Sequence, residues 1–323
     1  MKLAVTSSPH IRSKKNTSRI MLDVILALLP ALLAGVLSFG VRALLVTLVC
    51  ILAAAVSEWL CGMVLYHRNT VKDLSCVVTG LLLALTLPAT VPYWIAAVGS
   101  AFAIIVVKAV GGGLGKNIFN PALAARAFLM LFWPAALVRY AQPGAALPLT
   151  GSAVDVVTAA TPLHHMQMPA LPEEGILEMF LGNIGGTIGE VCTLALLIGG
   201  IYLIARGVIS ARIPAAYLGT VAVLSLVFSK GDNAFLWMVY SLLGGGVVLG
   251  AFFMATDYAT SPVTPKGQII YGIGCGILTV IFRYYGLFPE GVTYAILLMN
   301  ACAWAIDRYT APRRFGTGKG EKA

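Results

Sequence analysis

Charged residues are scarce in this chain of 323 residues. Only 11% of its residues are charged and 59% are apolar, whereas about 25% of an average soluble domain is charged. With a mean hydropathy of +0.89, little material is left for a soluble domain, and the sequence predicts an all-α polytopic membrane protein. A cleavable signal pattern is also missing, because residues 1–19 are polar and basic and the apolar run 20–39 is long enough to span.

Several patterns typical of enzymes and nucleic-acid binders are missing as well. The six cysteines include no C-x-x-C pair, so no zinc or iron–sulfur site is written locally, and we expect buried cysteines that act as small apolar residues. A cluster shared with another protein of a complex stays open. There is no metal-ligand spacing, nucleophile–base pair or paired-carboxylate pattern, so we expect no complete active site in this chain alone.

The net charge of +9 is not carried by a basic run interleaved with aromatic residues, and we expect no nucleic-acid partner. Basic residues at the ends of membrane helices orient a protein and contact anionic lipid headgroups, which explains this charge better.

Ten apolar segments read as membrane spans, of which the seventh is short and the weakest. They are residues 20–39, 42–65, 74–90, 93–110, 119–138, 188–205, 215–228, 234–256, 269–285 and 293–306. With the N-terminus inside, 17 of the 22 Lys and Arg residues fall in inside segments, 4 fall outside and Arg126 lies within a span. This bias predicts that both termini are cytoplasmic.

The span count divides the chain into five parts. These are a cytoplasmic segment 1–19, a first transmembrane half 20–138, an extracytoplasmic loop 139–187, a second half 188–308 and a basic cytoplasmic tail 309–323. Glycine clusters at 111–115 and 244–250 form a weak echo about five spans apart. Two halves with an odd number of spans would be inverted repeats, as in many transporters.

The loop contains the most informative motif of the chain, Asp155-Val-Val-Thr158-Ala-Ala-Thr161. It resembles the flavin-attachment motif acidic-x-x-Ser/Thr-Gly-Ala-Thr, in which FMN is joined through its phosphate to the last threonine. This predicts a phosphoester between FMN and Thr161, with Asp155 and Thr158 close to the cofactor. Ala159 stands where glycine is usual. The alternative is a threonine-rich polar turn.

Two polar stretches on the inner side suggest a second ligand. Asn117, Asn120 and Arg126 follow a glycine-rich break and are predicted to line a polar cavity, because irregular backbone at membrane depth must be buried or face water. The alternative for Asn120 is a helix cap before Pro121. Thr256 and Asp257 end the eighth span on the same side and suit hydrogen bonding to a flavin, or simply a polar helix end.

Carboxylates inside the membrane are costly and are functional candidates. Glu58 lies in the second span, where reaching back to the membrane surface is the alternative role, and Glu190 lies near the start of the sixth. These two and Asp257 are candidates for an ion path. Gly189 belongs to a glycine-rich entry that would let backbone approach the FMN. His164 and His165 follow Thr161, where solvated histidines are the simpler reading.

Several stretches together resemble one known family of membrane proteins. They are Ser8–Arg12, Val78–Pro88, Gly115–Ala122, Thr158–Leu163, Ala255–Asp257 and Pro289–Asn300. The family includes the D subunit of the Rnf electron-transport complex and the B subunit of the sodium-pumping NADH:quinone oxidoreductase, and the resemblance covers nearly the whole chain.

The resemblance implies an electron-relay subunit of a ferredoxin:NAD⁺ oxidoreductase complex in the bacterial inner membrane that moves Na⁺ or H⁺. It implies covalent FMN on the threonine that matches Thr161, installed by an extracytoplasmic flavin transferase. It further implies a non-covalent flavin, riboflavin, which we assign to the inner polar stretches, and a urea-transporter-like fold of inverted repeats. The partners would be the other membrane and peripheral subunits of the complex.

Two other functions stay open. One is the quinone-reductase subunit, which usually has a longer N-terminal extension than the 19 residues that precede the first span here. The other is a solute channel or transporter of similar fold without a redox role, and only the flavin separates it cleanly.

Overall fold

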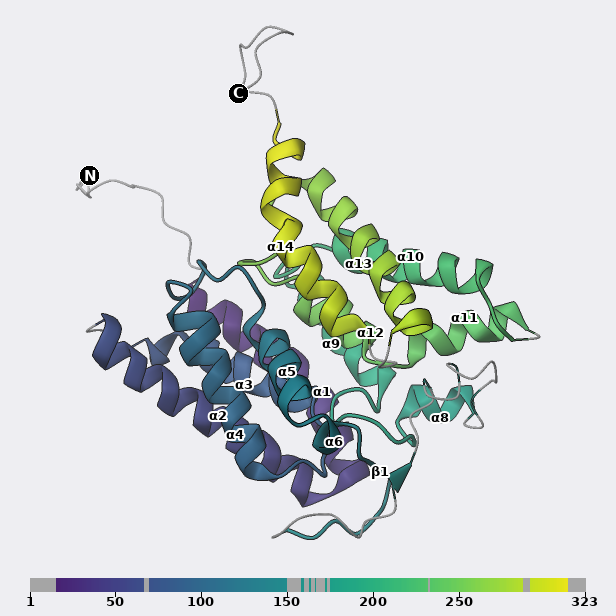
Figure 1. Ribbon diagram of the computed structural model, residues 1–323, viewed down its shortest axis with the longest axis horizontal. Helices are drawn as coiled ribbons and strands as arrows, with labels where there is room; N and C mark the ends of the chain where they lie inside the picture. Colours follow the sequence, from purple (N-terminus) through teal and green to yellow (C-terminus); the bar gives the residue numbers. More distant parts are fainter. Residues whose placement is uncertain are drawn as a thin grey trace, which may run out of the picture.

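The computed structural model describes residues 16–66, 70–149, 158–159, 163, 166, 172, 175–231, 233–286 and 291–312. These residues are mostly helical, as the composition predicts, and their helices form two sets joined by the region that contains the candidate flavin loop (Figure 1). Asp155 and Thr161 lie outside the described residues.

The first set comes from the N-terminal part of the chain. Its helices are α1 (Thr17–Phe39), α2 (Val41–Cys61) continued by the π-helix η1 (Gly62–Tyr66), α3 (Ser75–Leu85), α4 (Tyr93–Phe102) continued by the π-helix η3 (Ala103–Ala109), and α5 (Pro121–Phe132). Three short elements accompany them: η2 (Val71–Asp73), α6 (Pro134–Leu137) and β1 (Tyr140–Ala141). Pro134, at the start of α6, forces a break after α5.

The second set follows β2 (Thr158–Ala159) and α8 (Ile176–Leu181). Its helices are α9 (Thr193–Ala205), α10 (Arg212–Val227), α11 (Ala234–Leu243), α12 (Val247–Leu249) continued by the π-helix η4 (Gly250–Met254), α13 (Pro265–Tyr285) and α14 (Val292–Thr310). The segment α11 and the segment α12–η4 meet at an angle of 59°.

The helices differ in whether they are long enough to cross a membrane. Within the described residues, three helices are long and apolar enough to cross a membrane: Thr17–Phe39, Val41–Leu65 and Pro265–Tyr285. The bent pair Ala234–Leu243 and Val247–Met254 gives a fourth if it is one span. The other predicted spans overlap helices that are shorter or less apolar. The chain is therefore a polytopic membrane protein, and ten complete crossings remain a prediction.

Helices at corresponding positions in the two sets make similar contacts within their own set. In the first set α2 contacts α3 and α4, and α4 contacts α5; in the second set α10 contacts α11 and α13, and α13 contacts α14. Between the sets, α1 contacts α9 and α5 contacts α14. The first helices of the two sets are thus partners, and so are the last.

Helix α3 is short because it stops inside the protein. Its 11 residues span about 16 Å, roughly half of the hydrocarbon core. Leu85, at its end, and Leu87 present carbonyls that accept hydrogen bonds from the backbone N–H groups of Gly189 (2.8 Å) and Ile188 (3.0 Å). A segment from the other side of the candidate flavin loop therefore satisfies the end of this helix, as the bilayer requires.

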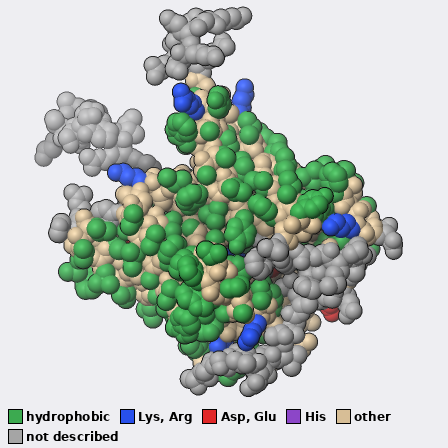
Figure 2. Space-filling model, viewed as in Figure 1, with side chains coloured by type: hydrophobic (Ala, Val, Ile, Leu, Met, Phe, Trp, Pro, Cys, Tyr) green, Lys and Arg blue, Asp and Glu red, His purple; other side chains and the backbone are tan. Residues whose placement is uncertain are grey.

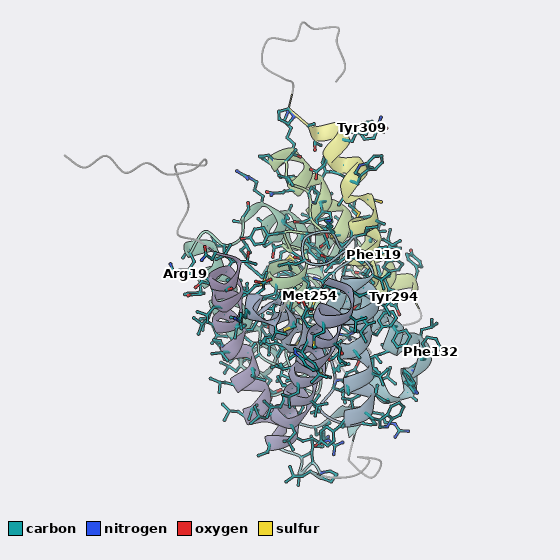
Figure 3. The ribbon with its side chains drawn as sticks, turned by 90° about the vertical axis from the view of Figure 1, so that its left-hand side faces the viewer. Arg19, Phe119, Phe132, Met254, Tyr294 and Tyr309 are labelled. Carbon is teal, nitrogen blue, oxygen red and sulfur yellow. The ribbon has the colours of Figure 1, made fainter. Side chains whose placement is uncertain are left out.

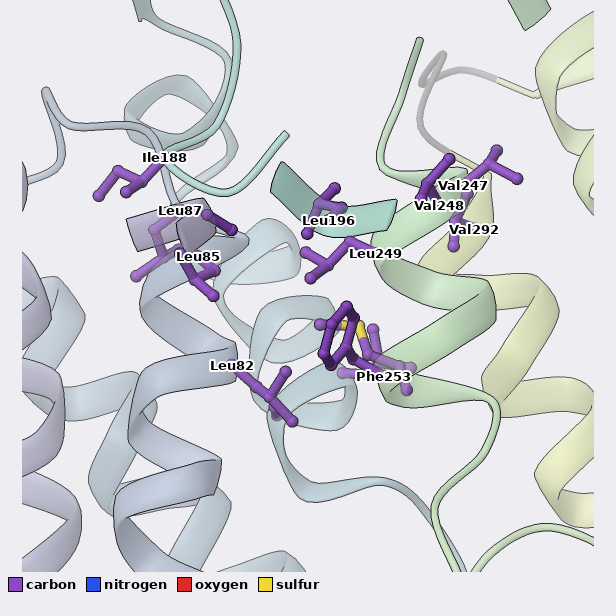
Figure 4. Close-up of a cluster of buried hydrophobic side chains, with 14 of the residues drawn as sticks. Leu82, Leu85, Leu87, Ile188, Leu196, Val247, Val248, Leu249, Phe253 and Val292 are labelled. Carbon is purple, nitrogen blue, oxygen red and sulfur yellow. The ribbon is translucent and has the colours of Figure 1, made fainter. Parts of the chain in front are cut away.

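One part of the buried core lies where α3, α9, α12 and η4 meet. Leu82, Leu85, Leu196, Leu249 and Phe253 converge there (Figure 4) and are almost fully buried. Apolar side chains also cover most of the visible surface, and Lys and Arg are sparse on it (Figure 2). Such a surface fits a lipid environment better than water.

Figure 3 shows the direction of the terminal helices. Arg19 lies at the upper end of α1, Phe119 lies just before the upper end of α5, and Phe132 marks the lower end of α5. Helix α14 runs the opposite way, from Tyr294 up to Tyr309. The start of α1 and the end of α14 therefore lie toward the same end of the molecule.

Candidate functional site

A cavity lies between the two helix sets. Its apolar wall includes Val24 of α1, Leu82 of α3, Leu203 of α9 and Phe252 and Phe253 of η4. Its polar lining comes from both sets: Ser75, Thr79, Lys108, Asn117, Asn120, Thr256 and Asp257. Four of the five residues that the sequence predicts for a second flavin, Asn117, Asn120, Thr256 and Asp257, therefore lie together here. Arg126 does not line this cavity.

Asn117 and Asn120 hold the break between η3 and α5. The Asn117 side-chain amide donates to the carbonyl of Phe119 at 3.0 Å. Asn120 is the N-cap of α5, where its side-chain oxygen accepts from the backbone N–H groups of Ala122 and Leu123, and Pro121 follows at the first position. The capping role is confirmed, and it coexists with a place in the cavity wall.

Asn120 also connects the two sets. Its side-chain nitrogen donates to the carbonyl of Met254 at 3.4 Å, at the end of η4. The hydroxyl of Thr256, just beyond, donates to the carbonyl of Phe252 at 2.6 Å. The polar rim of the cavity therefore includes a bond that crosses from one set to the other.

Asp257 follows the end of η4 and is partly buried. Burial raises the pKa of its carboxyl above the ordinary value, and the Ala259 backbone N–H and the Thr260 hydroxyl, which donate to it, act in the opposite direction. This carboxyl binds a proton more readily than an exposed aspartate does.

Glu58 forms a buried ion pair instead of reaching the membrane surface. The Lys108 ammonium donates to Glu58 Oε2 at 2.8 Å and to Ser75 Oγ at 2.7 Å. The side chains of Glu58 and Lys108 are only 8% and 5% exposed. Lys108 and Ser75 line the cavity, whereas Glu58 lies behind them.

The remaining candidates lie away from the cavity. Arg126 is buried in α5, where it interacts electrostatically with Tyr140, Glu190 and Tyr294. Glu190 is buried and accepts from the Thr187 hydroxyl at 3.2 Å. A side chain at Gly189 would place its Cβ 2.6 Å from the Cβ of Leu85, so this glycine is required for the approach to α3.

The candidate flavin loop is attached to both helix sets by residues that flank Thr161. In the antiparallel pair of β1 and β2, Thr158 faces Ala141 and Ala159 faces Tyr140. On the other side, Leu163 is buried and lies against Gly244 and Gly245, at the break between α11 and α12. Gly245 has φ +71°, and a Cβ there would be 2.0 Å from Leu163 Cδ1, so only glycine fits.

Arg283 of α13 stabilises the same break. Its guanidinium is buried and donates to the carbonyls of Ser241, Gly244 and Gly245. Carbonyls at a helix end lack partners in a continuing helix, and a cation is favoured at a helix C-terminus. Arg283 is one of the four basic residues that fall outside in the charge count, and nothing in the sequence predicted this contact.

Sequence reasoning also missed Lys108 and Leu163. Lys108 could have been suspected because it is a lysine in a long apolar run. Leu163 offers no signal in a single sequence. Five of the six cysteines are buried and Cys302 is exposed. Among the described residues, no three His, Cys, Asp or Glu side chains form a metal-ligand group.

Comparisons with known proteins cover the whole chain. Residues 4–316 match the NQR2, RnfD, RnfE family. The chain is 49% identical to the D subunit of the Na⁺-translocating ferredoxin:NAD⁺ oxidoreductase complex of Acetobacterium woodii, over 100% of this chain and 98% of that protein. It is 44% identical to the D subunit of the proton-translocating ferredoxin:NAD⁺ oxidoreductase complex of Clostridium ljungdahlii, over 97% and 96% of the two chains. The D subunit of the ion-translocating oxidoreductase complex of Marinobacter nauticus is 37% identical, over 100% and 98%.

Proposed function

Because this chain belongs to the NQR2, RnfD, RnfE family, we propose that it is a membrane electron-relay subunit of a ferredoxin:NAD⁺ oxidoreductase complex that translocates Na⁺ or H⁺. The observation that carries this proposal is the similarity over the full length to relatives that bear this name. The partners are the other membrane and peripheral subunits of that complex. One of these relatives is named for Na⁺ and one for protons, so the family relation leaves the ion open.

The first part of the proposal is covalent FMN on Thr161, joined by a phosphoester and installed by an extracytoplasmic flavin transferase. The motif Asp155 to Thr161 supports it. The attachment of the loop adds support, because Ala159 pairs with Tyr140 of β1 and Leu163 is buried on the break of the second set. These contacts lie on both sides of Thr161 in the sequence, which suits a loop that carries a cofactor.

The second part is a non-covalent flavin, riboflavin, in the cavity between the sets. The kinds of side chain in the lining suit such a group, since Leu82, Phe252 and Phe253 offer apolar surface and Asn117 and Asp257 offer polar groups. The cavity has a volume of about 90 Å³, so its walls would have to move apart to admit a flavin. Asn117, Asn120, Thr256 and Asp257 would hold it. A bound flavin supplies the ability to accept and donate electrons, and the protein supplies position and electrostatics.

The third part concerns topology. We propose that residues 20–138 and 188–308 are inverted repeats of five spans, that the loop 139–187 is extracytoplasmic, and that both termini are cytoplasmic. The matched helix contacts of the two sets support the repeats. The opposite directions of α5 and α14 support the inversion, and the start of α1 and the end of α14 lie toward the same end of the molecule, which supports termini on one side (Figure 3). Glu58, Glu190 and Asp257 are the carboxylates that we propose for an ion path.

The test of the flavin is fluorescence of the denatured chain in a gel. Full-length wild type, Thr161→Ala and the control Thr70→Ala are each expressed with a flavin transferase whose activity is shown on a second protein. We expect fluorescence that survives denaturation in wild type and Thr70→Ala and none in Thr161→Ala.

The other outcomes separate the alternatives. No fluorescence in wild type, beside an active transferase, would contradict the flavin and favour a solute channel or transporter of the same fold. Fluorescence with electron transfer from NADH to quinone, and none between ferredoxin and NAD⁺, would favour the quinone-reductase member of this family.

A further inference from the structure

The ion pair of Glu58 and Lys108 is arranged for more than stability. Lys108 and Ser75 are among the residues that line the cavity, whereas Glu58 is not, and both Glu58 and Lys108 are almost fully buried. A cation that enters from the cavity beside Ser75 therefore reaches Lys108 before Glu58. Lys108 therefore occupies the position that such a cation would need.

The backbone conformation at Lys108 also indicates a functional role for this residue. Lys108 lies in η3, a π-helix of seven residues that continues α4. Such segments are rare, occur mostly as single turns and are frequent at functional sites. Here the side chain that the π-helix presents reaches Glu58 on α2 and Ser75 on α3. A lysine has a flexible stem of four carbons, so its ammonium can change partners.

We propose that Glu58 binds the transported cation and that Lys108 is a tethered cation which occupies Glu58 until the transported one replaces it. The site offers the oxygens of a carboxylate and of the Ser75 hydroxyl, which suit Na⁺ and, for the carboxylate, a proton. The displaced ammonium turns toward the cavity that Lys108 lines. The inference rests on the proposed function, because the cation is taken to be the one that the complex translocates.

Charge balance explains why such an exchange would not leak. A buried carboxylate that loses its counter-charge is strongly unfavourable. Replacement of one positive charge by another keeps the site neutral overall, whereas departure of Lys108 alone does not. Cation arrival and lysine departure are therefore coupled.

The first test is carbodiimide labelling of Glu58, because this reagent attacks protonated carboxyl groups in apolar surroundings. Full-length wild type, Lys108→Met, Lys108→Arg and Lys116→Met are labelled in native membranes and Glu58 is followed by peptide mass spectrometry. Lys116 is an exposed lysine and serves as the matched control. Glu58→Gln identifies the labelled site.

We expect labelling of Glu58 to rise roughly tenfold in Lys108→Met, since the ammonium that occupies the carboxylate is gone and the reagent can react with it. Wild type, Lys108→Arg and Lys116→Met should stay low. Na⁺, against choline at equal ionic strength, should slow labelling of Lys108→Met if Na⁺ is the cation. If the labelling of Lys108→Met depends on pH and not on Na⁺, the cation is a proton. Cys61 and Cys76 are the other titratable groups beside the pair. Equal labelling of wild type and Lys108→Met would overturn the proposal.

A second test uses wild type only, so it does not depend on the folding of a variant. Reductive methylation measures how accessible the Lys108 amine is, with Lys116 in the same chain as the reference. The ratio of Lys108 to Lys116 methylation should rise about twofold or more when Na⁺ or acid populates the displaced state. A ratio that does not change with either would contradict the exchange. Neither test needs bound flavin, so a failure here is distinguishable from a failure of the flavin proposal.

Discussion

The two helix sets bury positive charge in different ways. In the first set Lys108 faces two side chains, Glu58 and Ser75, next to the cavity. In the second set Arg283 faces three backbone carbonyls at the break of α11. A side-chain partner can accept another cation, whereas carbonyls at a helix end need their donor permanently. The charge of Lys108 therefore suits exchange, whereas the charge of Arg283 is structural.

The largest change should come from breaking the structural charge. Arg283→Met leaves the carbonyls of Ser241, Gly244 and Gly245 without these donors. At about 1.5–3 kcal/mol for each bond to a charged group, we expect a loss of about 5 kcal/mol or more. Thermal unfolding in detergent, with protein yield, measures it. The exposed Arg212→Met is the control, and an Arg283→Met protein as stable as that control would refute the structural role.

Substitution of Lys108, the exchangeable charge, should change the free energy of unfolding in a way that depends on Glu58. Lys108→Met alone leaves a buried carboxylate and should cost about 3–5 kcal/mol, whereas Glu58→Gln with Lys108→Met should restore most of the loss. A double-mutant cycle of unfolding measures this coupling. Additive effects of the two substitutions would show that the pair is not a unit, and the contrast with Arg283 would disappear.

A smaller, pH-dependent effect is expected at Asp257. The folded protein holds the proton of this carboxyl more tightly than the unfolded chain, because its pKa is raised. This contribution is complete below the unfolded pKa of about 3.9 and is lost as the pH rises through the folded pKa. Asp257→Asn should remove that decline. Unfolding temperatures of both proteins from about pH 4 to about pH 7 test it, and parallel curves would contradict it.

The smallest effect should come from the ion pair between α1 and α9. Arg206 contacts Asp23 at 3.2 Å, but its side chain is 57% exposed. Arg206→Met should cost less than about 1 kcal/mol, and less in high salt. Unfolding measured at two salt concentrations decides this. If Arg206→Met lowered stability as much as Lys108→Met does, the exposed ion pair would contribute as much as the buried one, which would contradict this prediction.

Sequence reasoning predicted the elements better than their contacts. Asn117 and Asp257 meet in one cavity, as predicted from their common place on the inner side. Arg126 does not join them, because six residues beyond Asn120 place it roughly 240° further around the helix. Lys108 and Glu58 are 50 residues apart, and the π-helix shifts the helical register, so no periodic pattern could have revealed their pairing.

The short helix α3 has a consequence for the order in which the protein is made. The carbonyls of Leu85 and Leu87 obtain their donors from Ile188 and Gly189, which are synthesised later. At roughly 5 to 20 residues per second, the roughly hundred intervening residues take about 5 to 20 seconds to emerge. During that interval the first set has an unfinished helix end inside the membrane. Insertion factors that shelter such an end would matter more for this protein than for one whose helices all complete their own crossing.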